Sequence, residues 1–250
     1  MKHQGKVAFI TGGAIGFGYA FAEALAAEGA SIVIAEINME SANQAVAKLI
    51  AAGHRAIAVD CDVADDVAVD TAVAKAIAEF GGIDILINNA GLHLTKYNQP
   101  FSVLPRSDVR ALFDVNLMGV VNCSVACLDS MRSRGGGNIV SISSMASNMS
   151  SSPYGVSKLA VRGLTIAFAR EFADAGIRVN AISPGLIATE SAIADLPAEQ
   201  VTMIVDQMQA IHRLGAVPDI VNMMLFLISE EASFITGETF KVSGGAALSI

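Results

Sequence analysis

The sequence predicts an α/β fold in a single domain, in which helices cover both faces of a parallel β-sheet. Short apolar segments rich in branched residues alternate with longer helical patterns along the chain. A glycine-rich turn joins the first apolar segment to the first helical pattern. The 250 residues suit one domain of ordinary size, and they contain neither an internal repeat nor a linker. We therefore expect one domain over residues 1–250.

Seven strands and six long helices are expected from this alternation. The strands are expected near residues 6–11, 31–36, 56–60, 83–88, 137–143, 177–182 and 239–242. The helices are expected near residues 16–28, 40–52, 66–80, 106–133, 153–174 and 217–229. Asp65-Asp66 and Ser107-Asp108 supply residues that favour helix starts for two of these helices.

The first strand, loop and helix have the pattern of a nucleotide-binding site. Val7–Ile10 form a short apolar run, and residues 11–18 then fit T-G-x-x-x-G-x-G before a helical pattern. Gly12 permits a tight turn, Gly16 allows the backbone to approach a pyrophosphate, and Gly18 allows helix and strand to pack closely. The start of the helix then offers free N–H groups to phosphates. The alternative is a cluster of turn glycines without a ligand.

A carboxylate follows the second strand, at the position where dinucleotide-binding folds hold the ribose. Glu36 ends the run 31–36, about twenty residues after the glycine loop. Its charge should repel a 2′-phosphate, and neither residues 11–18 nor Ile37-Asn38 supply a positive charge. We therefore expect NAD, not NADP, as the cofactor. The alternative is a glutamate that only ends a strand at the surface.

A tyrosine and a lysine lie one helical turn apart in the string PYGVSK. A phenol titrates near pH ~10, so it is a poor base at neutral pH. The ammonium of Lys158 should lie on the same helix face as Tyr154 and lower the pKa of the phenol. Such a pair can transfer a proton to or from a substrate. An isolated pair with this spacing would more often be an exposed tyrosine and a solvated lysine.

Composition excludes several classes of protein. The net charge of −8 argues against nucleic acid, whose binding needs a basic surface. The apolar runs are interrupted, so we expect none to reach the ~18 residues of a membrane span. The start MKHQGKVAF lacks the apolar core of a signal peptide, and we expect a cytoplasmic enzyme. Cys61, Cys123 and Cys127 should be reduced, and no metal site is expected.

Together these features resemble the short-chain dehydrogenase/reductase family over nearly the whole chain. Eight segments match family motifs in the family's order: TGGAIGFG (11–18), DCDV (60–63), NNAG (88–91), FDVNLMG (113–119), IVSISS (139–144), YGVSK (154–158), SPGLIAT (183–189) and FITGETFKVSGG (234–245). The resemblance implies a Rossmann fold with a seven-stranded parallel sheet. It also implies hydride transfer between NAD and a secondary alcohol or ketone.

The resemblance also implies the site residues. Tyr154 would exchange a proton with the substrate, and Ser144 would hydrogen-bond the substrate oxygen. Lys158 would lower the pKa of Tyr154 and hold the nicotinamide ribose. Asn116 would hold a water that links Lys158 to solvent. The residues expected to bind the cofactor are Gly12, Ile15, Gly16, Gly18, Glu36, Asp62, Val63, Asn89, Ala90, Gly91, Tyr154, Lys158, Pro184, Gly185, Ile187 and Thr189.

The sequence departs from the family pattern at two places. Only nine residues separate Ser144 from Tyr154, where the family usually has a few more, so a loop of the substrate cleft is shortened. Ser144 matches the serine at the end of the family's strand, whereas Ser141 and Ser143 should be packing or solvent residues. Ser243 stands where the family often has Asp, and we expect an effect on packing near the C-terminus only.

The substrate cleft is expected to be mostly apolar. The residues expected to contact substrate are His93, Leu94, Met145, Leu186 and Met203, with Leu92, Tyr97, Ser191 and Met208 as further cleft residues. Residues 187–212 break the alternation and resemble the family's substrate lid, the alternative being two ordinary surface helices. Such a cleft favours a hydrophobic or aryl-alkyl secondary alcohol. A sugar or polyol dehydrogenase is the alternative, and a catalytically silent NAD-binding regulator is less favoured.

The expected assembly is a homotetramer. The helices expected near 106–133 and 153–174 carry many Ala, Val, Leu and Met residues, and one sheet face cannot bury all their sides. The family commonly pairs these two helices into a four-helix bundle, and the last strand with the tail AALSI would form a second contact. Two perpendicular two-fold contacts close a tetramer.

Overall fold

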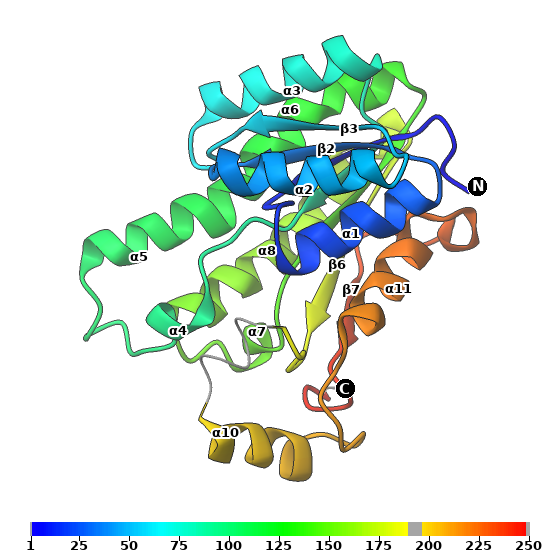
Figure 1. The fold of residues 1–250 in the computed structure, drawn as a ribbon. Helices are drawn as coiled ribbons and strands as arrows, with labels where there is room; N and C mark the ends of the chain where they lie inside the picture. Colours follow the sequence, from blue (N-terminus) through cyan, green and yellow to red (C-terminus); the bar gives the residue numbers. More distant parts are fainter. Residues whose placement is uncertain (1, 190–196, 249–250) are drawn as a thin grey trace.

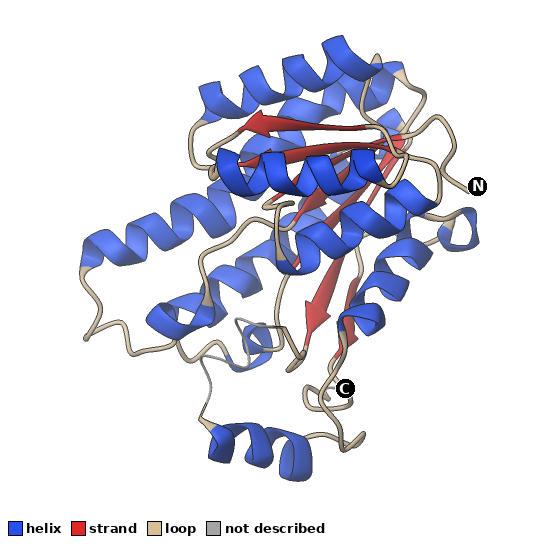
Figure 2. Ribbon diagram, viewed as in Figure 1, coloured by secondary structure: helices blue, strands red, loops and turns tan. Residues whose placement is uncertain are grey.

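The computed structural model of the chain describes residues 2–189 and 197–248. Parallel strands form one sheet in the order β3-β2-β1-β4-β5-β6-β7 (Figures 1 and 2). The strands are β1 Val7–Thr11, β2 Ser31–Glu36, β3 Ala56–Asp60, β4 Ile85–Asn88, β5 Gly137–Ile142, β6 Ile177–Pro184 and β7 Thr239–Val242. The predicted fold class, a seven-stranded parallel sheet between helices, is confirmed.

The long helices form two layers because successive strand residues point to opposite faces of the sheet. Ala8 and Ile10 of β1 belong to one core, and Val7 and Phe9 belong to the other. The first core packs under α1 (Gly16–Ala27), α2 (Met39–Ala51) and α11 (Val217–Ile228). The second packs under α3 (Asp66–Phe80), α6 (Gly119–Ser133) and α8 (Pro153–Glu171). Burial of both faces explains why the strands are apolar almost throughout.

The sheet order reverses between β1 and β4, which pair with each other in the middle of the sheet. In open α/β sheets a crevice forms at such a point, beyond the carboxyl ends of the strands. Three short helices gather at this end of the molecule (Figure 1): α4 (Leu94–Tyr97), α7 (Ala146–Met149) and α10 (Ala198–Met203). The fold therefore favours a binding site in this crevice.

Residues 187–212, expected to form a lid, fall partly outside the described residues, because 190–196 are not described. Ser191, an expected cleft residue, lies in that gap. Within the described part, α10 continues into a π-helical turn at Ile204–Met208. Ile187 pairs with Gly215 in an isolated parallel bridge, so the two ends of the segment lie side by side.

The helix expected over 106–133 is one continuous helical segment, but its winding changes. It comprises α5 (Arg106–Phe113), a π-helical turn at Asp114–Met118, and α6. By length and composition, the helical segment Arg106–Ser133 could cross a membrane, so the expectation that no segment would pass this test was wrong. The core helix of a soluble protein passes the same test, and α6 packs against β4, β5 and α3.

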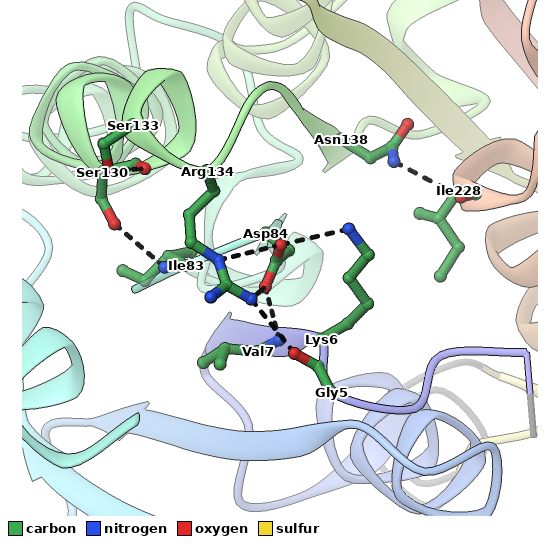
Figure 3. Close-up of polar contacts among 10 residues, drawn as sticks. All are labelled: Gly5, Lys6, Val7, Ile83, Asp84, Ser130, Ser133, Arg134, Asn138 and Ile228. Atoms are coloured by element: carbon green, nitrogen blue, oxygen red, sulfur yellow. Dashed lines mark hydrogen bonds and ion pairs between the residues drawn. The ribbon is translucent and has the colours of Figure 1, made fainter. Parts of the chain in front are cut away.

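A buried carboxylate joins three elements at the amino ends of the strands (Figure 3). The Asp84 side chain is 3% exposed and accepts hydrogen bonds from Lys6 Nζ at 3.2 Å and from the Val7 backbone N–H at 2.9 Å. Arg134, just after α6, donates to both carboxylate oxygens of Asp84, at 3.2 and 2.8 Å. A charge so buried is stable only with such partners, so the cluster ties α6 to β1 and β4.

Candidate active site

The glycine loop after β1 has the geometry that a pyrophosphate needs. Gly12 and Gly16 have backbone φ angles of 60° and 55°, which residues other than glycine rarely adopt. A Cβ on Gly18 would overlap the carbonyl oxygen of Gly12, so helix α1 can lie this close to the loop only with glycine there. The N-cap of α1, Ile15, makes no side-chain hydrogen bond to the first turn, which leaves backbone N–H groups available to an anion.

A set of hydrogen bonds fixes this loop to the end of β4. The Thr11 hydroxyl accepts from the N–H groups of Asn89 and Ala90, both at 3.0 Å. The Asn89 amide returns two bonds, to the carbonyl oxygens of Thr11 at 3.0 Å and Gly12 at 2.9 Å. Asn89 therefore holds the loop in shape. Thr11 was not predicted as a site residue, although it begins the glycine motif.

Two acidic residues follow the neighbouring strands and line the same cavity. One oxygen of the Glu36 carboxylate accepts from the N–H groups of Ile37 at 3.1 Å and Asn38 at 3.4 Å. Asp62 accepts from the N–H of Ala64 at 3.0 Å. These bonds orient both carboxylates beside the cavity, where they can accept hydrogen bonds from hydroxyl groups.

On the other side of the cavity, helix α8 presents Tyr154 and Lys158 from its first turns. Ser152 caps the helix by accepting from the N–H of Gly155 at 3.2 Å, and Pro153 occupies its first position. The Ser144 hydroxyl, just after β5, hydrogen-bonds the Tyr154 side chain. Ser144 therefore lies beside Tyr154, although the loop between them is shorter than in most of the family.

The other two serines of the strand segment are engaged elsewhere. The Ser141 hydroxyl accepts from the Asn88 amide at 3.3 Å inside the core. The Ser143 hydroxyl donates to the backbone carbonyl of Lys158 at 2.8 Å. Both side chains are buried, so Ser144 alone of the three hydrogen-bonds Tyr154 in the part of the chain that the structure describes.

The electrostatics of the pair differ from the expectation. Burial raises the pKa of Tyr154, and the hydrogen bond from Ser144 opposes that shift in part. Burial also lowers the pKa of Lys158 to about 8. The ammonium lies 5.9 Å from the centre of the tyrosine ring and donates to the Ile142 carbonyl at 2.9 Å. The pKa of Tyr154 is therefore raised, not lowered as expected, and Lys158 is not among the causes of this shift; its contribution to catalysis stays a prediction.

Asn116 lies in the π-helical turn and is almost fully buried, with 1% of its surface exposed. Its side-chain oxygen accepts from the N–H of Leu92 at 2.7 Å, and its amide nitrogen donates to Ser157 Oγ at 3.2 Å. Both ends of the Asn116 amide are thus occupied by protein groups. The water that Asn116 was expected to hold stays a prediction, and the side chain's observed partners are Leu92 and Ser157.

One cavity of about 700 Å³ brings most of the predicted residues together. Its walls include Gly12, Ile15, Gly16, Glu36, Asp62, Val63, Asn89, Ala90, Gly91, His93, Leu94, Ser144, Tyr154, Lys158, Pro184, Gly185, Leu186, Ile187 and Thr189. Gly18 and Asn116 do not line it and act through packing and hydrogen bonds. Met145, Met203, Tyr97 and Met208 do not line it either, so the structure does not support them as contact residues.

Several cavity residues were not predicted, among them Phe17, Thr95, Asn98, Val115, Pro197 and Gln200. Asn98 accepts a hydrogen bond from the capping Ser152 at 3.0 Å, which joins the loop after α4 to α8. Tyr97 packs instead with Leu104 and Leu112 in a small apolar cluster. Only the fold brings Asn98 and Ser152 together, so a local sequence pattern could not reveal the pair.

Ser243, which stands where the family often has Asp, is buried near the C-terminus, and the expected effect on packing stays a prediction. A Cβ on Gly185 would lie 2.6 Å from the Cα of Ser243, so this glycine lets the end of β6 approach the chain after β7.

The three cysteines are buried free thiols, and burial raises the pKa of Cys61 to about 12. Among the described residues, no group of three or more His, Cys, Asp or Glu side chains could hold a metal ion.

The residues fit a dinucleotide, as judged by the structure itself. A Cβ at Gly12 or Gly18 would crowd neighbouring atoms, and the start of α1 lines the same cavity as the Ser144–Tyr154–Lys158 group. Glu36 and Asp62 lie between the ends of β2 and β3, where ribose hydroxyls could be bound. Such a cavity can place a hydride carrier beside a proton donor or acceptor.

Comparison with known proteins agrees with this geometry. A family model described as enoyl-(acyl carrier protein) reductase matches residues 12–247. An uncharacterised oxidoreductase of Mycobacterium tuberculosis is 43% identical over 96% of each chain. The cis-4-hydroxycyclohexanecarboxylate dehydrogenase of Sinomonas cyclohexanicum is 37% identical, again over 96% of each.

A steroid enzyme is similar in both sequence and structure. The 7α-hydroxysteroid dehydrogenase of Escherichia coli is 35% identical over 98% of this chain and 95% of the relative. A solved 7α-hydroxysteroid dehydrogenase in complex with NADH and 7-oxo glycochenodeoxycholic acid superposes with a TM-score of 0.90, covering 98% of this chain and 95% of that one. With a glycine loop, a Ser–Tyr–Lys group and relatives that match end to end, the chain belongs to the short-chain dehydrogenase/reductase family.

Proposed function

We propose that this oxidoreductase transfers a hydride between NAD and a secondary alcohol or ketone, with Tyr154 as the acid and base. The observation that carries the proposal is one cavity that contains the glycine loop at one end and the Ser144–Tyr154–Lys158 group at the other. When bound, the nicotinamide supplies the hydride acceptor or donor. The chain's own residues position the carbinol and move its proton.

In the oxidation direction, Tyr154 takes the proton of the substrate hydroxyl, and in reduction it returns it. Ser144 hydrogen-bonds the same tyrosine and is placed to hold the substrate oxygen beside it. Lys158 is buried next to Tyr154, so its charge can favour the phenolate whenever the ammonium form is present. The three groups thus bind the substrate oxygen and transfer its proton.

We propose NAD as the cofactor because of the charge at the ribose end of the cavity. The Glu36 carboxylate is held beside it by the N–H groups of Ile37 and Asn38, and none of the described cavity residues near Glu36 carries a positive charge. A 2′-phosphate there would face an unpaired carboxylate at close range. Glu36→Ala should therefore lower the ratio of the kcat/KM with NAD to the kcat/KM with NADP.

The proposed substrate is a hydrophobic or aryl-alkyl secondary alcohol. The cavity lining includes the apolar residues Leu92, Leu94, Leu186 and Pro197, and apolar walls favour apolar substrates. A polyol is the second candidate, because Thr95, Asn98 and Gln200 add polar groups to the same wall. The relatives named for hydroxysteroid and hydroxycyclohexanecarboxylate oxidation act on secondary hydroxyl groups of rings, which supports the first class.

The test is turnover with NAD and NADP on a panel of secondary alcohols, followed at the absorbance of the reduced cofactor. We expect oxidation of ring and aryl-alkyl alcohols with NAD, and loss of turnover in Tyr154→Phe with NAD binding retained. Retained binding in this variant separates a proton-transfer role from a binding role. NAD binding with no turnover on any alcohol would instead favour a catalytically silent regulator, and turnover confined to polyols would favour the second candidate.

We also propose a homotetramer. Exposed apolar side chains lie on α6, on α8 and at the end of the π-helical turn before α6, namely Val125 (53% exposed), Leu159 (43%), Ile166 (50%) and Met118 (43%). Only 39% of the most apolar window of Arg106–Ser133 is buried within the chain, so much of this surface remains for a partner. Light scattering at micromolar concentration tests this, and a stable, active monomer would refute it.

A further inference from the structure

We infer that Ser157 is a positioning residue that holds Asn116, and through it the loop after β4, against helix α8. The inference rests on the proposed function, because this loop and this helix form two walls of the proposed active site. Ser157 has no part in the proton transfer proposed above, and it does not line the cavity. Its buried hydroxyl nevertheless takes part in two of three linked hydrogen bonds.

The three bonds run from the loop to the helix. The Leu92 N–H donates to Asn116 Oδ1 at 2.7 Å, and Asn116 Nδ2 donates to Ser157 Oγ at 3.2 Å. Ser157 Oγ then donates to the Tyr154 carbonyl at 2.8 Å. Ser157 is fully buried and Asn116 is 1% exposed, so water cannot easily replace a lost partner.

The bonds fix which way the Asn116 amide points. The Asn116 side-chain oxygen must face the backbone N–H of Leu92, which donates to it. The side-chain nitrogen must face Ser157 Oγ, which can only accept here because its own hydrogen is donated to the backbone carbonyl of Tyr154. The π-helical turn at Asp114–Met118 carries Asn116 between these partners, and such turns are frequent at functional sites. The orientation of the amide therefore depends on the Ser157 hydroxyl.

The same amide lies beside the lysine of the site. A Cβ on Gly91 would lie 3.2 Å from Asn116 Oδ1 and 3.4 Å from Lys158 Nζ, so both groups flank this glycine. If the amide lost Ser157 and turned, the Leu92 N–H would lose its acceptor beside the cavity. The loop around Leu92, which lines the cavity together with Tyr154 and Lys158, would then lose its fixed position. Turnover would fall more than the affinity for the cofactor.

The experiment compares Ser157→Ala and Ser157→Cys with Thr165→Val. Thr165 is the matched control, because it lies on the same helix, is buried, and donates its hydroxyl to the Val161 carbonyl at 2.8 Å without any link to the site. The cysteine variant nearly keeps the volume of serine but is a poor hydrogen-bonding partner, so it remains informative if the alanine variant folds badly. Hydrogen–deuterium exchange of the peptide around Leu92 and steady-state kinetics are measured on each.

In both Ser157 variants we expect exchange at Leu92 to become faster by about tenfold and kcat to fall by about tenfold or more, with the KM for NAD changed by less than about threefold. The Thr165 variant should resemble wild type in both measurements. Unchanged exchange at Leu92 would overturn the inference whatever the kinetics, and so would faster exchange with an unchanged kcat. If wild type turned over no alcohol, the proposed function would fail, and the exchange comparison alone would decide the role of Ser157.

Discussion

Lys158 should destabilise the ligand-free protein at neutral pH, and its replacement by methionine should reveal this. The side chain is 6% exposed, and its ammonium donates to the Ile142 carbonyl at 2.9 Å. No carboxylate among the described residues forms an ion pair with it. Burial therefore lowers the pKa of Lys158 from 10.5 to about 8. At roughly 1.4 kcal/mol per pKa unit, this drop corresponds to about 3 kcal/mol.

The direction in which the free energy of unfolding changes with pH follows from proton binding. Because the native pKa lies below the unfolded one, the unfolded chain binds more protons between about pH 8 and 10.5, so the free energy of unfolding rises with pH in that window. Below the native pKa both forms are protonated, and the penalty is present in full. Lys158→Met lacks this contribution, so its stability relative to wild type should decrease by about 2–3 kcal/mol between about pH 7 and pH 10.

The assay is urea unfolding followed by far-ultraviolet circular dichroism, since the chain contains no Trp. The cysteine thiols titrate in this pH range in the unfolded chain, but that contribution is common to both proteins and cancels in the difference. Lys75→Met, at an exposed position of α3, is the control and should run parallel to wild type. If Lys158→Met and wild type also gave parallel pH profiles, the lysine would not carry the penalty that its burial implies.

Two further predictions concern the buried cluster and the glycine loop. Asp84→Asn should lower the free energy of unfolding by about 1–3 kcal/mol, because its charge-assisted hydrogen bonds to Lys6 and Arg134 would be lost or weakened, whereas the exposed Asp129→Asn should change it by less than about 0.5 kcal/mol. Urea unfolding measures both. Gly18→Ala should prevent NAD binding, because its Cβ would push α1 away from the glycine loop. Calorimetric titration showing wild-type affinity would contradict this.

The fold could be predicted because its signals are local. Strands buried on both faces are short apolar runs, and the helices between them begin with residues such as Asp65, which caps α3 by accepting from two N–H groups. The four-residue helices α4 and α7 were not predicted, because so few residues show no period. The π-helical turn around Asn116 was not predicted either, since its partners Leu92 and Ser157 come from other elements.

The site was predictable where function requires one residue type at one position. Gly12, Gly16 and Gly18 are required by backbone geometry, and Tyr154 and Lys158 by the spacing of a helix. The apolar cleft residues were harder, because a methionine in a loop is compatible with a cavity wall or with the surface. Met203 illustrates this: it is 44% exposed and does not line the cavity.

The Tyr154–Lys158 pair shows where spacing alone misleads. Spacing predicts attraction between an ammonium and a phenolate, and in water that attraction would lower the pKa of the phenol. Burial acts on both groups in the opposite sense, because it disfavours each charged form: the pKa of Tyr154 rises while that of Lys158 falls to about 8. The hydrogen bond from Ser144 is the contribution that favours the phenolate here. Ser144 therefore opposes the effect of burial on the pKa of Tyr154, and Lys158 can favour the phenolate only when its side chain is in the ammonium form.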